Sequence, residues 1–177
     1  RWSEIVLGTI REPRGEQARL FLLLAMATLP AAAAGLVLEK QAEESFRNPL
    51  LIAGSLVVFG LVLGAAEFWG SRRREWTQIG WRVFLLVGAA QSLAIIPGVS
   101  RSGATISAGL FLGLTLSSAA ELSFLLSAPI IAGAVVHQLG DIAFSDVTGP
   151  FVFGVAVSAL TGWAAVRLFL RGLGRWG

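Results

Sequence analysis

The side chains best suited to chemistry lie together in one short stretch, Pro97 to Thr105, with the sequence PGVSRSGAT. Arg101 stands between the hydroxyl groups of Ser100 and Ser102, and Thr105 follows about one helical turn later. A guanidinium group offers a planar fork of donors that suits phosphoryl oxygens, and hydroxyl groups add short donors beside it. One of the hydroxyl groups could also act as a nucleophile. The stretch therefore predicts a phosphate site, with these four side chains as candidate catalytic residues.

The backbone of the same stretch also suits an anion. We expect Ser100 or Ser102 to cap a helix that runs from Gly103 onward, whose first amides lack partners within the helix. Such a helix end carries a partial positive charge and binds phosphate readily. Gly98 and Gly103 punctuate the turn and are candidate substrate-binding residues. The alternative is a polar helix break in which Arg101 pairs with a carboxylate, but an arginine at membrane depth is costly and usually functional.

Two polar residues outside the turn are further candidates for substrate binding. Gln91 precedes the break by about two helical turns, where it could bind a substrate or form a contact between helices, and the spacing leaves both open. Glu121 is expected to close a capping box with Ser118, and a direct role at the site is the second possibility. No carboxylate pair lies close enough to the turn to hold a metal alone, so no metal ligand is predicted in this chain.

The turn is flanked by two apolar arms that are too short to cross a bilayer. Val83–Ile96 and Gly103–Leu116 contain 14 residues each. A helix of that length reaches about 21 Å, whereas the hydrocarbon core is about 30 Å thick. The arms therefore predict a re-entrant helix pair with its polar tip inside the membrane region. Irregular backbone at that depth must be buried in protein or line a wet cavity.

Longer apolar segments predict four full membrane spans in addition to this pair. The chain is 55% hydrophobic and 14% charged, and its mean hydropathy is +0.73, which is typical of membrane proteins. The predicted fold is an all-α polytopic membrane helix bundle, forming one integral membrane domain over residues 1–177. Pro30 should kink the first span unless neighbouring helices accommodate it. The four predicted spans are Leu20–Leu38, Leu50–Ala66, 118–136 and Phe151–Leu170.

The distribution of charge predicts the orientation of these spans. A net charge of +3 could indicate nucleic acid, but 11 of the 14 basic residues lie in three clusters beside membrane spans. This is typical of a topology signal, so we expect no nucleic-acid partner. The three clusters are predicted to be cytoplasmic, with both chain ends, while the connections that contain Arg47 and Asp146 lie outside. Because the chain begins with Arg1, we expect a processed product or a fragment.

The run QSLAIIPGVSRSGATI, residues 91–106, closely resembles the signature of the bacitracin-resistance family of undecaprenyl-diphosphate phosphatases. The run AELSFLLSAP, residues 120–129, resembles the family's next span, and 27–36 resembles an earlier one. By this resemblance, the residues from Ser100 to Gly103, with Thr105, match the family's second phosphate-binding turn, and Gln91 matches its upstream glutamine.

The resemblance implies a membrane enzyme that removes the terminal phosphate of undecaprenyl diphosphate, recycling the lipid carrier of cell-wall synthesis and giving bacitracin resistance. It implies a bacterial inner-membrane location, membrane lipids as surroundings and a divalent cation (Mg or Ca); self-association into a homo-oligomer is left open. The family's first repeat, with its Glu-rich turn, serine pair and histidine, is not matched, nor is its last span. The chain thus resembles the middle and later part of the enzyme, and the implied cation ligands are not in this chain.

A second class of function fits the same residues. Re-entrant pairs with an arginine at the tip also suit a transporter or binding protein for an anionic lipid or small anion. The upstream coding sequence would distinguish the two classes. A Glu-rich turn ending in a serine pair and a histidine would favour the phosphatase, and its absence would favour binding or transport.

Overall fold

The computed structural model describes residues 2–44, 48–71, 73–138 and 148–176, and within these ranges the protein is built of helices without strands. Helices make up 85% of the structure. Four of them are long and apolar enough to cross a membrane, in segments Glu16–Leu38, Pro49–Trp69, Leu116–Gln138 and Gly149–Phe169. The predicted fold class, an all-α polytopic membrane helix bundle, is confirmed.

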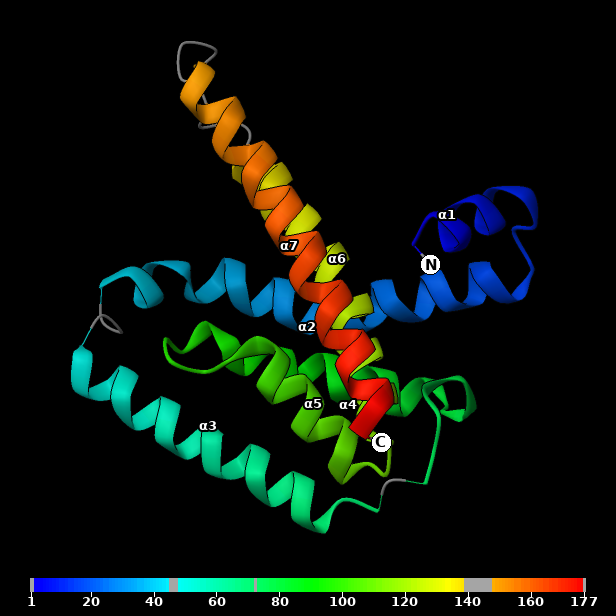
Figure 1. Ribbon diagram of the computed structural model, residues 1–177, viewed down its shortest axis with the longest axis horizontal. Coiled ribbons are helices and arrows are strands. Elements are labelled where there is room, and N and C mark those ends of the chain that lie inside the picture. Colours follow the sequence, from blue (N-terminus) through cyan, green and yellow to red (C-terminus); the bar gives the residue numbers. More distant parts are fainter. Residues whose placement is uncertain (1, 45–47, 72, 139–147, 177) are drawn as a thin grey trace. The chain divides into compact units, whose positions relative to one another are not determined.

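Figure 1 shows the helices along the chain. In chain order they are α1 (Trp2–Arg11), α2 (Glu16–Glu44), α3 (Pro49–Trp69), η1 (Trp76–Gln78), α4 (Trp81–Gln91), η2 (Ser92–Ile95), α5 (Arg101–Phe111), α6 (Leu116–Gln138) and α7 (Gly149–Trp176). The predicted spans each lie within one of the long helices. The helix α2 continues through Pro30, and the two predicted short arms form α4 with η2, and α5.

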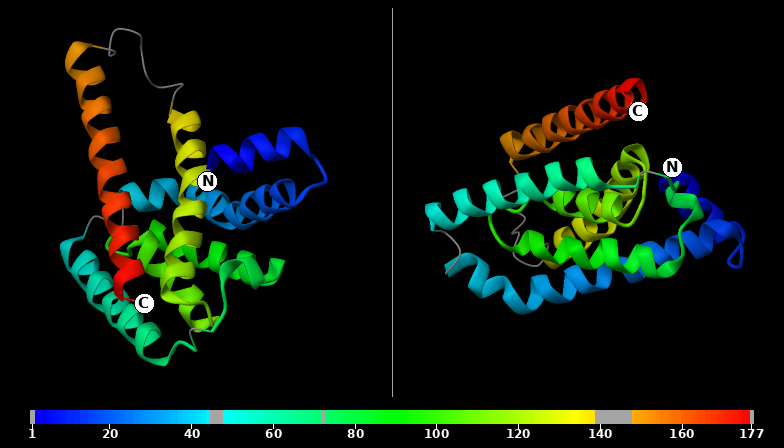
Figure 2. Two further views of the ribbon diagram at one scale, coloured as in Figure 1. Left: turned by 45° about the vertical axis from the view of Figure 1, so that its right-hand side comes forward. Right: turned by 90° about the horizontal axis from the view of Figure 1, so that it is seen from below.

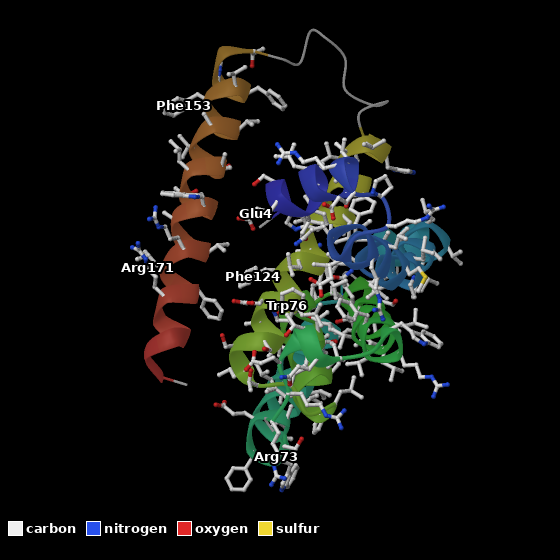
Figure 3. All side chains as sticks on the ribbon, turned by 90° about the vertical axis from the view of Figure 1, so that its right-hand side faces the viewer. Glu4, Arg73, Trp76, Phe124, Phe153 and Arg171 are labelled. Atoms are coloured by element: carbon white, nitrogen blue, oxygen red, sulfur yellow. The ribbon has the colours of Figure 1, made fainter. Side chains whose placement is uncertain are left out.

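The structure divides into two compact units, Arg1–Ile130 and Ile131–Gly177, with the boundary inside α6. That residues 1–177 form a single domain stays a prediction. The second unit contains the end of α6 and the whole of α7, and Figure 3 shows Phe153 and Arg171 towards opposite ends of α7. In α7 the guanidinium of Arg167 lies 4.9 Å from the centroid of the Trp163 ring. The predicted outer-face residues Arg47 and Asp146 lie outside the described residues.

The first unit is organised by the short pair α4 and α5, which lies between the long helices α2 and α3 (Figures 1 and 2). The helix α4 packs against α2, and α5 packs against α3. The approach of α4 to α2 requires a glycine, because a Cβ on Gly88 would lie 1.9 Å from the carbonyl oxygen of Ala27. A core of apolar side chains fills the space between the helices, including Leu24, Phe84, Val87, Leu110 and Leu122.

The segment between α3 and α4 is joined to the connection between α5 and α6 by backbone hydrogen bonds. The amides of Arg73 and Arg74 each donate to the carbonyl oxygen of Gly113 at 3.0 Å, and the amide of Thr115 donates to that of Arg74 at 3.0 Å. Gly113 itself adopts φ +92°, in the left-handed region. We call this joint the 73–115 clasp; it fixes where α6 begins.

The start of α6 corrects one prediction. Ser118 lies inside the helix, so the predicted capping box of Ser118 and Glu121 is wrong. The amide of Ser118 instead donates to the hydroxyl oxygen of Thr115 at 3.2 Å. The Ser118 hydroxyl donates to the carboxylate of Glu75, which reaches the helix from the facing segment. Threonine is itself a good capping residue, and a carboxylate near a helix start is favourable, so the helix begins one turn earlier.

Candidate functional site

In the predicted phosphate turn, the extended residue Ser100 is followed directly by the helix α5. Ser100 has φ −68° and ψ 120°, and its hydroxyl oxygen accepts a hydrogen bond from the amide of Gly103 at 3.2 Å. Ser100 is therefore the cap, and α5 begins at Arg101 rather than at Gly103 as predicted. The hydroxyl oxygens of Ser100 and Ser102 lie 3.3 Å apart, and both side chains are exposed. Two hydroxyl groups and the first amides of a helix thus gather at one point.

The two glycines of the turn allow this geometry in different ways. Gly98 has φ +91°, a conformation that side chains disfavour, and a Cβ there would lie 2.4 Å from the carbonyl oxygen of Ile52 in α3. The turn thus rests directly on the backbone of α3. A Cβ on Gly103 would lie 3.1 Å from the Cβ of Ser100, so this glycine makes room for the capping side chain. That either glycine contacts a substrate stays a prediction.

Arg101 is the positive charge of the turn. It is the first residue of α5 and its side chain is half-buried. Among the described residues no carboxylate forms an ion pair with its guanidinium group, so the alternative of an arginine neutralised by a neighbouring acid is not seen there. A cation beside unpartnered helix amides is a suitable arrangement for a phosphate group.

Thr105 faces away from the open side of the turn. The side chain is fully buried, and its hydroxyl oxygen lies 3.0 Å from the carbonyl oxygen of Arg101 and 3.1 Å from that of Ser102. It also lies 2.7 Å from the hydroxyl oxygen of Ser123 in α6, which is 2% exposed. In this geometry Thr105 holds the first turn of α5 and links it to α6. That it takes part in the chemistry stays a prediction.

The side chain of Gln91 is buried and has no hydrogen-bond partner among the described residues. Gln91 is the last residue of α4, on the face that also carries Phe84, Val87 and Gly88, and it is 2% exposed. Neither amide atom of its side chain is hydrogen-bonded within the described structure, so the expected alternative of a contact between helices is not seen. A buried amide left unpaired is costly, which favours a partner that the described residues do not supply.

Comparison with known proteins decides the family. The model of the family "Bacitracin resistance protein BacA" matches residues 1–176. This chain belongs to the BacA family. Three curated proteins named undecaprenyl-diphosphatase are similar to it. The protein of Moorella thermoacetica is 44% identical over 97% of this chain and 66% of its own length. Those of Geobacter sulfurreducens and Pelotomaculum thermopropionicum are 46% and 45% identical, each over 96% of this chain, and over 65% and 66% of their own lengths.

The resemblance drawn from residues 91–106 is therefore confirmed, and the chain is a multi-pass membrane protein of the BacA family. The chain spans about 65% of the length of these curated relatives.

Glu121 is placed beside the clasp in this BacA-family chain. Its carboxylate accepts a hydrogen bond from the indole nitrogen of Trp76 at 2.7 Å, and Figure 3 shows Trp76 on the segment that faces α6. This contact gives Glu121 a structural role in joining α6 to the segment before α4. That it binds substrate stays a prediction.

The donors of the turn fit an anion and not a divalent cation. They are hydroxyl groups, backbone amides and a guanidinium group, whereas Mg²⁺ and Ca²⁺ require oxygen ligands such as carboxylates. Within the described ranges no group of three or more His, Cys, Asp or Glu residues could hold a metal ion. The cation that the resemblance implies therefore finds no ligand set among the residues described.

Sequence reasoning did not identify Ser123 as part of the site. The available signal was its residue type, because a serine within the apolar run AELSFLLSAP requires a hydrogen-bond partner when it is buried. The chain offers several such serines, and only the structure shows that Ser123 meets Thr105 on the neighbouring helix.

Proposed function

We propose that this protein hydrolyses undecaprenyl diphosphate to undecaprenyl phosphate and inorganic phosphate. Membership of the BacA family and the names of its curated relatives support this activity. The observation that carries it is the Ser100-capped start of α5, where Arg101 has no carboxylate partner among the described residues. The phosphoryl group of a lipid diphosphate would neutralise this charge and would accept hydrogen bonds from the first amides of α5.

In the proposed reaction the terminal phosphate lies against the first turn of α5. The amides of Arg101 and Ser102 can donate hydrogen bonds to it, because the first amides of a helix have no partners within that helix. The guanidinium group of Arg101 stabilises the charge on the phosphoryl oxygens as the bond to the bridging oxygen breaks. In a one-step route, water attacks phosphorus and both of its protons end on the inorganic phosphate. In a two-step route, the hydroxyl group of Ser100 or Ser102 attacks first, and water then hydrolyses the phosphoserine, which restores the hydroxyl group and releases inorganic phosphate. The bridging oxygen leaves on undecaprenyl phosphate.

A divalent cation would add charge neutralisation to this reaction. We include Mg²⁺ or Ca²⁺ in the proposal on the family resemblance alone. The described residues do not fit such an ion, so every step given above belongs to side chains and amides of this chain.

The proposal also includes a location and an orientation. We place the protein in the bacterial plasma membrane, surrounded by membrane lipids, with the arginine-rich segments and both chain ends in the cytoplasm. The support is the positive-inside pattern of the basic residues.

The test compares substitutions of two arginines in the natural full-length protein, purified and reconstituted in lipid. Arg101→Lys keeps the charge but loses the bidentate fork, which is not a conservative change at such a site. Loss of one preorganised donor costs about 10²–10³ in rate. We expect a fall of that size in phosphate release from undecaprenyl diphosphate, measured as kcat. The matched control is Arg82→Lys, because the guanidinium of Arg82 lies over the Trp81 ring, 5.5 Å from its centroid, and not at the turn.

Two results would contradict the proposed function. If Arg101→Ala retained near-normal turnover, Arg101 would have no part in the mechanism. If the unsubstituted protein bound undecaprenyl diphosphate without releasing phosphate, the role would be binding or transport of an anionic lipid.

A further inference from the structure

The helices α5 and α6 meet at two points, each one helical turn from the other. The hydroxyl oxygens of Thr105 and Ser123 lie 2.7 Å apart, and both side chains are buried. Four residues further along α5, a Cβ on Gly109 would lie 3.0 Å from the Cβ of Ala119, which is four residues back along α6. The helices are therefore antiparallel and in close contact, with a polar link between Thr105 and Ser123.

The Thr105 hydroxyl group is the donor of that polar link. Its single proton has three acceptors within reach, namely the hydroxyl oxygen of Ser123 at 2.7 Å and the carbonyl oxygens of Arg101 and Ser102 at 3.0 and 3.1 Å. Ser123 is the nearest of the three and the one that belongs to α6. By accepting from Thr105 it ties the first turn of α5 to α6.

Those carbonyl groups belong to the peptides that face the phosphate turn. The carbonyl of Arg101 shares its peptide group with the amide of Ser102, one of the first amides of α5. The carbonyl of Ser102 shares its peptide group with the amide of Gly103, which donates to Ser100. The Thr105 side chain therefore lies against the two peptide groups whose amides belong to the phosphate turn.

We propose that Ser123 is a positioning residue for the phosphate turn. Through Thr105 it fixes the first turn of α5, and with it the amides of Ser102 and Gly103, against α6. This inference rests on the proposed function, since it concerns the same turn. Ser123 itself does not touch the reacting atoms.

The next serine along α6 provides a matched control. The Ser127 hydroxyl donates to the carbonyl oxygen of Ser123, one turn back in its own helix, at 2.9 Å. The Ser127 hydroxyl group therefore has its hydrogen-bond acceptor within α6. Ser123 and Ser127 lie in the same apolar run and lose the same hydroxyl group on replacement by alanine, but only Ser123 is linked to α5.

The experiment uses the natural full-length protein in lipid and measures both turnover and binding. We expect Ser123→Ala to lower kcat/KM for undecaprenyl diphosphate about five- to tenfold, the equivalent of one neutral hydrogen bond. The affinity for inorganic phosphate, measured by calorimetry without any turnover, should fall by a similar factor. Ser127→Ala should change either quantity less than twofold.

Thr105→Val removes the same link from the α5 side, so its loss should equal or exceed that of Ser123→Ala. The double variant should lose little beyond Thr105→Val, because coupled residues are not additive. If Ser123→Ala does not fold, the comparison of Thr105→Val with Thr105→Ser, which keeps the hydroxyl group, takes its place.

Unchanged kcat/KM and unchanged phosphate affinity in Ser123→Ala would overturn the inference, as would additive losses in the double variant. If the unsubstituted protein released no phosphate, the proposed function would fail. The calorimetry would still decide the role of Ser123.

Discussion

Replacing Gly98 by alanine should disturb the phosphate turn for two separate reasons. The left-handed conformation at φ +91° costs about 1–2 kcal/mol for a residue with a side chain. The new Cβ would lie 2.4 Å from the carbonyl oxygen of Ile52, which is 1.0 Å less than the 3.4 Å of an ordinary contact. Because this neighbour is backbone, the turn itself must move, and forced packing of this kind costs about 1–3 kcal/mol. We expect Gly98→Ala to lower the free energy of unfolding by about 2–5 kcal/mol.

The same shift should be visible in catalysis. A displacement of about 1 Å at a reacting group can cost about 10²-fold in rate, so kcat for phosphate release should fall by that factor. Unfolding is followed by tryptophan fluorescence during titration with SDS, and phosphate release is measured in lipid. The control is Gly54→Ala in α3, where a Cβ would have no neighbour within 4 Å. Ser55→Gly should not rescue Gly98→Ala, because it removes only the 3.0 Å contact and leaves the carbonyl oxygen in place. If Gly98→Ala kept both stability and kcat, the turn would not rest on α3 as described.

Three other predictions concern the cap, the helix contact and the orientation. Ser100→Ala should destabilise the protein by about 0.5–2 kcal/mol through loss of the cap, measured by SDS titration; unchanged stability would argue against capping. Gly88→Ala should destabilise it by about 1–3 kcal/mol, because the new Cβ would meet the Ala27 carbonyl oxygen at 1.9 Å, and a wild-type unfolding curve would refute this. A cysteine replacing Asp146 should react with an impermeant maleimide in intact cells, whereas one replacing Arg73 should not; the reverse pattern would invert the topology.

Hydropathy and helix-stop signals predicted the helices well, because a segment that crosses a membrane must be a long run of apolar residues. The charge-free run of Leu20–Leu38 lies within α2, and the two arms that were too short to span are the short helices on either side of the turn. Residue type and position left Ser100 and Ser102 as alternative caps of a helix beginning at Gly103, and the structure shows Ser100 as the cap and Arg101 as the first residue. Local chemistry was thus sufficient to place a capped helix start in the turn, but not to choose between the two serines.

Contacts between distant segments could not be predicted in the same way. Sequence favoured Ser118 as the cap of α6, but Thr115 takes that place because Glu75, some 40 residues earlier, supports it. The direction of Thr105 depends on which face of α5 meets α6, and periodicity does not say which helix is the neighbour. Ser123 was one of several buried serines, and no local pattern distinguished it.

In the 73–115 clasp, the main chain and the side chains of Arg73 and Arg74 have separate roles. The amide groups of Arg73 and Arg74 hold the connection between α5 and α6, while both side chains are exposed. The joint therefore depends on the main chain and places no demand on the identity of these side chains, apart from proline, which has no amide hydrogen. The guanidinium groups take no part in this joint. Charge at this position can change in the course of evolution while the start of α6 stays where it is.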